Sequence, residues 1–277
     1  MKTLYMTDLD GTLLDGNALI SDYTRRVLCE LYEKGIPVAA ATARTEATVL
    51  KMFAGIPLGA PLILMNGVIT YDPTLESYLS VEEIPAVGAV CLAEVIESLN
   101  LGGFLYLIGD HGLETYWSKD REPHEEDFIR EREERYGKKF TRVPSVAELL
   151  RAPGGKRIVY FSVSGDEKLL GAAKDMLEGA SGIRCEFYRD IYVPEHWYLE
   201  ICASGASKKR ALMRIREQLG FEHVVGFGDN LNDLPLFEAC DYRIAVANAR
   251  DEVKAAADEV IGSNREDGVA KYLEKLI

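Results

Sequence analysis

The chain of 277 residues lacks several features that mark membrane, secreted or zinc-binding proteins. No apolar run approaches the roughly 18 residues of a membrane span. The first residues, Met1-Lys2-Thr3, lack the apolar stretch of a signal peptide. The five cysteines are scattered without a C-x-x-C pair, and the four histidines have no metal-ligand spacing. These absences predict reduced thiols in a cytoplasmic protein without a membrane segment.

The chain also has fewer basic than acidic residues. The chain has 32 Lys and Arg residues against 45 Asp and Glu residues, which gives a net charge of −13. Nucleic acids and anionic membranes need a basic binding surface, so we expect neither as a partner. A phosphorylated small molecule would also be repelled, unless local Lys, Arg and a metal ion reverse the sign of the charge. No obligatory protein partner is evident from the sequence.

Two acidic motifs stand out, and each follows a short apolar run: Asp8–Thr12 near the start and Gly228–Asp233 near the end. Such a run ending at acidic and glycine residues is typical of a buried strand that enters a loop. In open parallel α/β sheets the reactive crevice lies at the carboxyl ends of the strands. The carboxylates brought together there would be Asp8, Asp10, Asp229 and Asp233. They would repel one another without a divalent cation, and an all-oxygen site suits Mg²⁺.

The two ends of the chain alternate between apolar strand patterns and amphipathic helix patterns. We predict strands at 3–7, 36–41, 62–65, 224–227 and 244–246. Helices are expected from Ser21 to Gly35, at about 45–53, and at about 207–219, 232–239 and 250–257. This rhythm predicts an α/β fold with a Rossmann-like, doubly wound parallel sheet.

The middle of the chain has a different pattern. A helix at 87–99 precedes a hairpin-like strand pair and a charged helix at 125–136, and three further strands surround a helix at 166–178. This is the pattern of an α+β insertion. We therefore predict a core formed by residues 1–84 and 204–277, interrupted by a cap domain at 85–203. The proline at 85 and the glycine at 205 are expected at the hinges.

The motifs resemble those of the haloacid dehalogenase superfamily of phosphohydrolases. Asp8–Thr12 resembles motif I, and Gly228–Asp233 resembles motif IV. Ala41–Arg44 is similar to motif II of the Cof-like sugar-phosphatase branch, with Ala43 where glycine is usual, and Gly205–Lys208 resembles motif III. Recurring pieces of that branch also match at 65–67 and 247–249. The resemblance covers both core segments and implies the same fold and a type IIB cap.

The resemblance implies a role for each acidic residue. Asp8 would be the nucleophile that forms an aspartyl-phosphate, and Asp10 would be the general acid and base. Asp229 would hold Mg²⁺ together with Asp8 and the backbone carbonyl of Asp10. Asp233 would bind the metal through water or orient its ligands.

Five further residues are candidates for binding the substrate phosphate: Thr42, Arg44, Asn66, Lys208 and Asn248. Thr42 could instead be a helix cap, and Lys208 an ordinary surface lysine. Arg44 could reach the phosphate or tie the core to the cap. For Asn66 and Asn248 a left-handed loop conformation is an alternative without a role in binding.

These features together predict a Mg²⁺-dependent phosphatase acting on a small phosphorylated metabolite, such as a sugar phosphate. One alternative is a phosphomutase of the phosphomannomutase type, which shares the architecture. Another is a catalytically inactive regulatory or binding protein, although all motif residues are intact. We expect the cap to choose the leaving group, with Asp110, His111, Trp197 and Glu200 as candidate residues.

Overall fold

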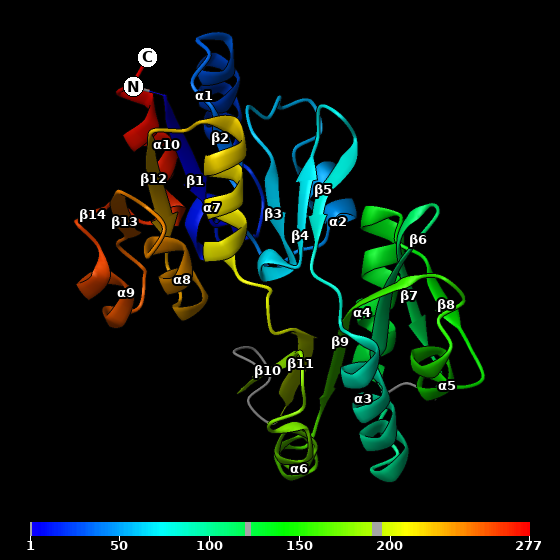
Figure 1. Cartoon of the computed structure of the whole chain (residues 1–277). Helices are drawn as coiled ribbons and strands as arrows, with labels where there is room; N and C mark the ends of the chain where they lie inside the picture. The colour runs from blue at the N-terminus through cyan, green and yellow to red at the C-terminus, as the bar shows by residue number, and fades with distance from the viewer. Residues whose placement is uncertain (1, 120–122, 190–195) are drawn as a thin grey trace. The chain divides into compact units, whose positions relative to one another are not determined.

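The computed structural model describes residues 2–119, 123–189 and 196–277 (Figure 1). The chain divides into two compact units. The core unit runs to Val81 and resumes over Ala206–Ile277, and the inserted unit is Glu82–Gly205. Their assignment as catalytic core and substrate-selecting cap stays a prediction.

A parallel five-stranded sheet forms the centre of the core unit, in the order β14-β13-β12-β1-β2. The strands are β1 (Thr3–Thr7), β2 (Val38–Ala40), β12 (His223–Gly228), β13 (Tyr242–Val246) and β14 (Glu259–Ile261). β1 and β12 pair from Thr3 opposite His223 to Thr7 opposite Phe227. The two acidic motifs therefore begin side by side, because each follows the end of one of these strands.

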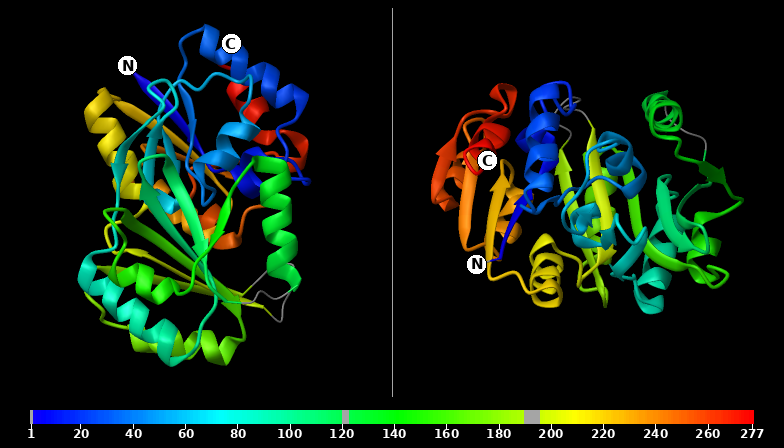
Figure 2. Two further views of the ribbon diagram at one scale, coloured as in Figure 1. Left: turned by 90° about the vertical axis from the view of Figure 1, so that its right-hand side faces the viewer. Right: turned by 90° about the horizontal axis from the view of Figure 1, so that it is seen from above.

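Helices cover both faces of this sheet, as Figure 2 shows. They are α1 (Asp22–Glu33), α2 (Glu46–Met52), α7 (Lys208–Leu219), α8 (Leu234–Phe237), α9 (Asp251–Ala256) and α10 (Gly268–Glu274). On one face, Leu4 and Met6 of β1 share a buried cluster with Leu212 of α7 and Leu236 of α8. On the other face, α10 packs beside α1. The predicted doubly wound α/β fold is thus confirmed.

A small antiparallel sheet adjoins this core. It consists of β3 (Leu62–Leu64), β4 (Ile69–Asp72) and β5 (Ser77–Val81). A parallel bridge between Ala41 and Ile63 links it to the end of β2. The tight turn at Asn66 has φ 54° and lets β4 fold back directly on β3.

The inserted unit has a separate six-stranded sheet in the order β10-β11-β9-β6-β7-β8. Its strands are β6 (Phe104–Gly109), β7 (Gly112–Trp117), β8 (Phe140–Arg142), β9 (Arg157–Gly165), β10 (Ile183–Arg189) and β11 (Trp197–Ala203). Its helices are α3 (Ala86–Ser98), α4 (Pro123–Tyr136), α5 (Val146–Arg151) and α6 (Glu167–Leu177). The strands pair antiparallel except β7 with β8, so the unit is α+β, as expected.

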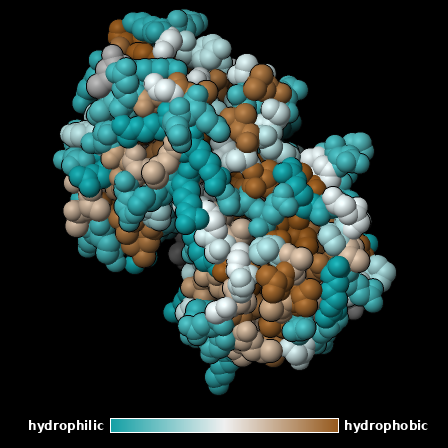
Figure 3. All heavy atoms as spheres, in the orientation of Figure 1, coloured by the Kyte–Doolittle hydropathy of each residue, from teal (hydrophilic) through white to brown (hydrophobic). Residues whose placement is uncertain are grey.

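The surface agrees with the composition. Hydrophilic residues cover much of the face shown in Figure 3, with hydrophobic ones scattered among them. Within the residues that the structure describes, no helix combines the length and apolar character that a membrane crossing requires. All five cysteines are unpaired.

Candidate active site

Asp8 lies at the carboxyl end of β1, where the chain turns sharply out of the sheet. Its backbone N–H donates to the Phe227 carbonyl at 3.0 Å, which fixes Asp8 beside the end of β12. Gly11 then has φ 79°, a left-handed conformation that favours glycine. A Cβ placed at Gly11 would collide with the Asp229 carboxylate. Glycine is therefore required here for backbone geometry and for the close approach of the two acidic loops.

Three of the four predicted acidic residues form one cluster. One carboxylate oxygen from each of Asp8, Asp229 and Asp233 lies within 4.8 Å of the others. Lys208 Nζ enters this cluster and donates to Asp8 Oδ1 at 2.8 Å and to Asp233 Oδ1 at 2.7 Å. The side chains of Lys208 and Asp233 are 1% and 0% exposed, so the ion pairs are out of water.

The buried cluster carries more negative than positive charge. Three carboxylates face one ammonium group, which leaves an excess of two negative charges. Loss of hydration, and then the charge of Asp233, raise the pKa of Asp8 well above its usual range. Loss of hydration likewise raises the pKa of Asp229 to about 6, although a hydrogen bond from Thr12 opposes the shift. Burial alone would lower the pKa of Lys208, but Asp233 and Asp8 raise it.

The loop after β12 is shaped by Asp233. Its Oδ2 accepts the backbone N–H groups of Asp229 and Asn230 at 3.0 and 3.1 Å. Thr12 Oγ1 donates to Asp229 Oδ1 at 2.9 Å, which orients that carboxylate from the opposite loop. Asp233 thus orients Asp229 through the backbone while its other oxygen holds Lys208.

The carboxylate of Asp10 lies outside the cluster and pairs with Arg44. Arg44 donates from Nε to Asp10 Oδ2 at 2.7 Å and from Nη2 to Asp10 Oδ1 at 2.6 Å. The Asp10 side chain is 50% exposed, whereas that of Arg44 is 15% exposed. This bidentate geometry is the strong form of an arginine–carboxylate pair. Arg44 therefore holds Asp10, a contact that neither of the predicted roles of Arg44 included.

Thr42 and Asn66 lie on the edge of the site formed by the ends of β2 and β3. Thr42 is buried, and its hydroxyl accepts the Arg44 backbone N–H at 3.2 Å. Asn66 has the left-handed conformation expected as an alternative, and its Oδ1 accepts from Asn232 Nδ2 at 3.3 Å. Gly67 follows with φ 96°, and a Cβ there would collide with the backbone at Ser207 and Lys208.

Lys208 is the first residue of α7, and the helix start fixes its position. Ser207 is the N-cap, and its hydroxyl accepts the Arg210 backbone N–H at 3.0 Å. The positive end of the helix dipole adds to the charge of Lys208 near the carboxylates. The alternative of an ordinary surface lysine is excluded by its burial.

Asn248 connects the loops that contain Gly11 and Asn264 through hydrogen bonds. Its Nδ2 donates to the Gly11 carbonyl at 2.7 Å, and its Oδ1 accepts the Asn264 backbone N–H at 2.9 Å. Asn264 in turn donates to the Leu14 carbonyl at 2.8 Å. Both polar ends of the Asn248 amide are therefore engaged with backbone, and its role in phosphate binding stays a prediction. Sequence reasoning missed Asn264, which lies in no recognisable motif, and the hydrogen bond from Thr12 to Asp229.

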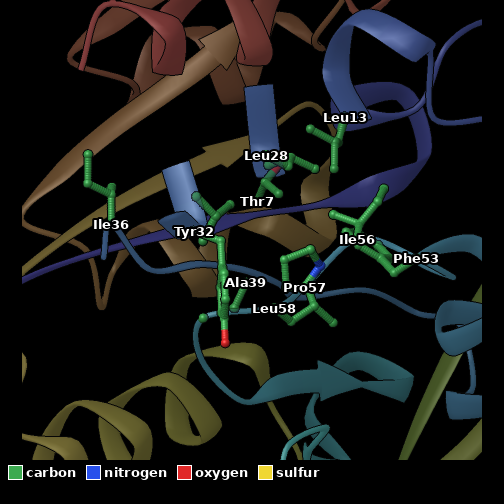
Figure 4. A pocket seen from close by; sticks show the side chains of 12 residues that line it. Thr7, Leu13, Leu28, Tyr32, Ile36, Ala39, Phe53, Ile56, Pro57 and Leu58 are labelled. Carbon is green, nitrogen blue, oxygen red and sulfur yellow. The ribbon is translucent and has the colours of Figure 1, made fainter. Parts of the chain in front are cut away.

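A small cavity in the core unit lies apart from this chemistry. Its walls, shown in Figure 4, are mostly apolar and include Leu28, Phe53 and Ile56. Its volume of about 10 Å³ is roughly the space of one water molecule. No carboxylate lines this cavity, so we treat it as a packing void rather than a binding site.

Comparison with known proteins agrees with this geometry. A family model described as haloacid dehalogenase-like hydrolase matches residues 5–273. The chain therefore belongs to the haloacid dehalogenase-like hydrolase family, in its Cof-like branch, and is a phosphatase of that family.

Curated relatives and solved structures match over nearly the full chain. The pyridoxal phosphate phosphatase YbhA of Escherichia coli is 27% identical, over 96% of this chain and 95% of its own length. The 5-amino-6-(5-phospho-D-ribitylamino)uracil phosphatase YcsE of Bacillus subtilis is 28% identical, over 98% and 94%. A crystal structure of a Thermotoga maritima protein superposes with a TM-score of 0.81 at 29% identity, over 99% and 97%.

Proposed function

We propose that this phosphatase hydrolyses a small phosphomonoester through an aspartyl-phosphate on Asp8, with Mg²⁺ as its cofactor. The observation that carries the proposal is the buried cluster of Asp8, Asp229 and Asp233 around Lys208, with its excess of two negative charges. A divalent cation would balance that charge and keep Asp8 and Asp229 ionised, against the raised pKa values that burial imposes.

The residues present fit a hard cation. The cluster supplies carboxylate oxygens, and no His or Cys belongs to it among the described residues. Oxygen ligands favour Mg²⁺ over Zn²⁺. Asp8 and Asp229 would hold the ion with the Asp10 backbone carbonyl, and Asp233 would orient Asp229 through the loop. When bound, the ion would neutralise charge on the transferring phosphoryl group.

The side chains divide the chemistry between them. An Asp8 carboxylate oxygen forms a bond to phosphorus as the bond to the leaving alcohol oxygen breaks, and Asp10 gives that oxygen its proton. Water then attacks the phosphorus of the aspartyl-phosphate and gives a proton to Asp10. This step releases phosphate and restores the Asp8 carboxylate. Lys208 supports the phosphoryl charge from the N-terminus of α7, and Thr42, Asn66 and Asn248 are proposed to bind phosphoryl oxygens. Arg44 holds Asp10 in place.

The substrate class is a small phosphorylated metabolite, such as a sugar phosphate or a related ester. The relatives support this range, since their names give pyridoxal phosphate and 5-amino-6-(5-phospho-D-ribitylamino)uracil as their substrates. The inserted unit is proposed to select the leaving group. Release of phosphate without an acceptor sugar separates this function from that of a phosphomutase, and any turnover separates it from that of an inactive binding protein.

The test compares Asp8→Asn with Asp15→Asn, using acetyl phosphate and measuring released phosphate. Asn at position 8 is a poor nucleophile and removes one charge, so turnover should be lost while the fold is retained. Asp15 lies nearby, but its carboxylate only accepts backbone N–H groups of a turn, so its variant should keep wild-type rates. Chelation should stop the wild-type enzyme and Mg²⁺ should restore it. Full activity of Asp8→Asn, or full activity in excess chelator, would refute the mechanism.

A further inference from the structure

Strand β10 forms one edge of the sheet in the inserted unit and has β11 as its neighbour (Figure 1). It has seven residues, Ile183–Arg189, whereas β8 at the opposite edge has three. It pairs with β11 in one register throughout, and it contains no proline. Proteins often protect an edge strand from pairing with another chain by making it short, by a bulge or by a proline. β10 has none of these three devices.

The ladder with β11 shows which backbone groups of β10 point to the outer edge. The Ser204 N–H donates to the Gly182 carbonyl at 3.0 Å, so these residues begin the ladder as a hydrogen-bonded pair. Bonded and non-bonded pairs alternate along an antiparallel ladder. Ile183, Cys185 and Phe187 therefore direct their N–H and C=O groups away from β11. Among the described residues, no loop or other strand bonds to these groups.

The side chains of β10 are apolar on one face of the sheet and charged on the other. Ile183, Cys185 and Phe187 pack against the buried cluster that contains residues of α3, α5 and α6. On the opposite face Arg184 and Glu186 form an ion pair at 3.3 Å, and their side chains are 33% and 46% exposed. Charges at an edge usually repel a second strand. These two differ in sign, so they complement a copy of themselves.

We propose that β10 is a dimerisation surface, to which a second copy of this chain adds its own β10 in antiparallel orientation. The two-fold axis passes between the two Cys185 residues. On the apolar face, Ile183 then lies opposite Phe187 of the second copy. On the charged face, Arg184 lies opposite Glu186 of the second copy, and the reverse pair forms on the other side of the axis. The two six-stranded sheets become one continuous sheet.

Charge selects this register among the alternatives. The outward-facing residues of the two strands must bond to one another, so the axis must coincide with a residue position of β10. An axis at position 184 places two Arg184 side chains face to face, and an axis at position 186 does the same for Glu186. An axis at position 187 places Glu186 opposite Tyr188. The axis at position 185 is the one that sets opposite charges directly across, which stabilises an antiparallel pair, whereas like charges destabilise it.

The four charges around the axis form a closed network. Each Arg184 contacts Glu186 of its own chain and faces Glu186 of the second copy. Exposed ion pairs contribute most reliably when several charges form such a network. The apolar face adds a β-branched side chain opposite an aromatic one at two points, another favourable cross-strand pair. The surface is therefore self-complementary on both faces and in its backbone.

The residues that we expected to choose the leaving group are not part of this surface. Trp197 and Glu200 lie on β11, one strand in from the edge. Asp110 and His111 lie in the turn between β6 and β7. Their role in selecting substrates stays a prediction, and the dimer proposal does not depend on it or on the proposed phosphatase function.

The first test measures the oligomeric state of the full chain by sedimentation velocity over a range of concentrations. The wild type should form a dimer that dissociates on dilution. Arg184→Glu and Glu186→Arg should each weaken dimerisation by about 10-fold or more, because each sets like charges across the axis at two points. The control is Arg151→Glu, which makes the same change of charge and breaks the pair of Arg151 with Glu97 at 2.6 and 2.7 Å. It should dimerise like the wild type.

Mixing the two single variants separates contacts between chains from contacts within a chain. In an equimolar mixture of Arg184→Glu and Glu186→Arg, the two acidic side chains of one chain lie opposite the two basic side chains of the other. The dimer should therefore return to near its wild-type strength. The contact within each chain stays broken in the mixture, so its repair cannot explain the recovery. Thermal unfolding of each variant alone verifies that it is folded.

A disulfide test determines the register. Arg184→Cys and Glu186→Cys are each made in a Cys185→Ser background. Positions 184 and 186 face each other across the axis as a non-bonded pair, with Cα atoms about 4.5 Å apart, which a disulfide can span. On mild oxidation the mixture should give a linked dimer. Each variant alone should not, because its introduced thiols are two residues out of register.

Three results would overturn the proposal. The first is a wild type that stays monomeric at every concentration, which would leave this edge to an extended segment of another protein. The second is a dimer that survives both charge reversals, and the third is equal cross-linking in the mixture and in the single variants. Either of the last two would place the interface on another surface of the chain.

Discussion

Lys208 offers the sharpest test of how the site is held together. We consider Lys208→Met, which keeps an unbranched apolar side chain and removes only the ammonium group. The lysine is 1% exposed and contacts Asp8 and Asp233, which are also out of water. Removing it leaves buried carboxylates facing one another without their cation. The variant should therefore lose both stability and activity.

The loss of stability can be estimated from general values. Removing one partner of a buried ion pair costs about 3–5 kcal/mol. For a domain of this size each kcal/mol lowers the Tm by about 2–4 °C, so the expected loss is roughly 6–20 °C. The measurement is thermal unfolding in chelator, so that no metal compensates. Mg²⁺ should then raise the Tm of the variant more than that of the wild type, because the variant has one more unbalanced negative charge.

The neighbouring lysine supplies the control. Lys209 is 40% exposed and pairs with Glu238 at 2.7 Å on the surface. Exposed pairs contribute about 0–1 kcal/mol, so Lys209→Met should barely change the Tm. If the two variants unfold at the same temperature in chelator, Lys208 does not stabilise the cluster and our account of the site is incorrect.

Two further substitutions test the loops around the cluster. Arg44→Ala should lower kcat for esters with poor leaving groups by about 10-fold or more, because Asp10 loses the bidentate contact that positions it. The kcat for an activated aryl phosphate should fall much less. Equal losses on both kinds of ester would show that Arg44 acts on the phosphate instead. Gly11→Ala should impair activity and lower the Tm, because its φ of 79° strains alanine and the added Cβ meets Asp229. Gly35→Ala is the matched control, since Gly35 has φ 71° with nothing within 4 Å of the added Cβ. It carries the backbone strain without the collision, so equal activity in the two variants would contradict the steric argument.

Much of the fold was predictable because the sequence patterns that indicate its strands and helices are local. Apolar runs that stop at acidic or glycine residues predicted β1 and β12, and α1 begins after its N-cap Ser21, where a helix was expected to start. The structure adds elements that these signals did not reveal: β4, β5, β8, β14 and α10. The three-residue strand β14 has the polar Glu259 at its start, and β5 is only partly buried. Neither strand has the continuous apolar run that marks a buried strand. Their pairing with neighbouring strands, rather than their own residues, makes them part of a sheet.

The acidic cluster was predictable for a topological reason, whereas its detailed contacts were not. Parallel strands that are neighbours in a sheet bring their carboxyl ends together, so two acidic motifs far apart in sequence must meet if β1 pairs with β12. Strand pairing does not determine which basic side chain each carboxylate contacts. Asp8 and Asp10 are two residues apart, yet Asp8 contacts Lys208 and Asp10 contacts Arg44.

The separation of these two carboxylates has a chemical consequence for the proposed mechanism. A nucleophile and a general acid need different protonation states at the same pH, and a shared environment would tend to give them the same one. Asp8 is buried among carboxylates and a single lysine, and needs a cation to remain ionised. Asp10 is half exposed and held by an arginine from the next strand end, outside the cluster and open to water. The end of β1 thus places the two carboxylates in different environments, and Gly11 lets the turn that follows them come close to Asp229.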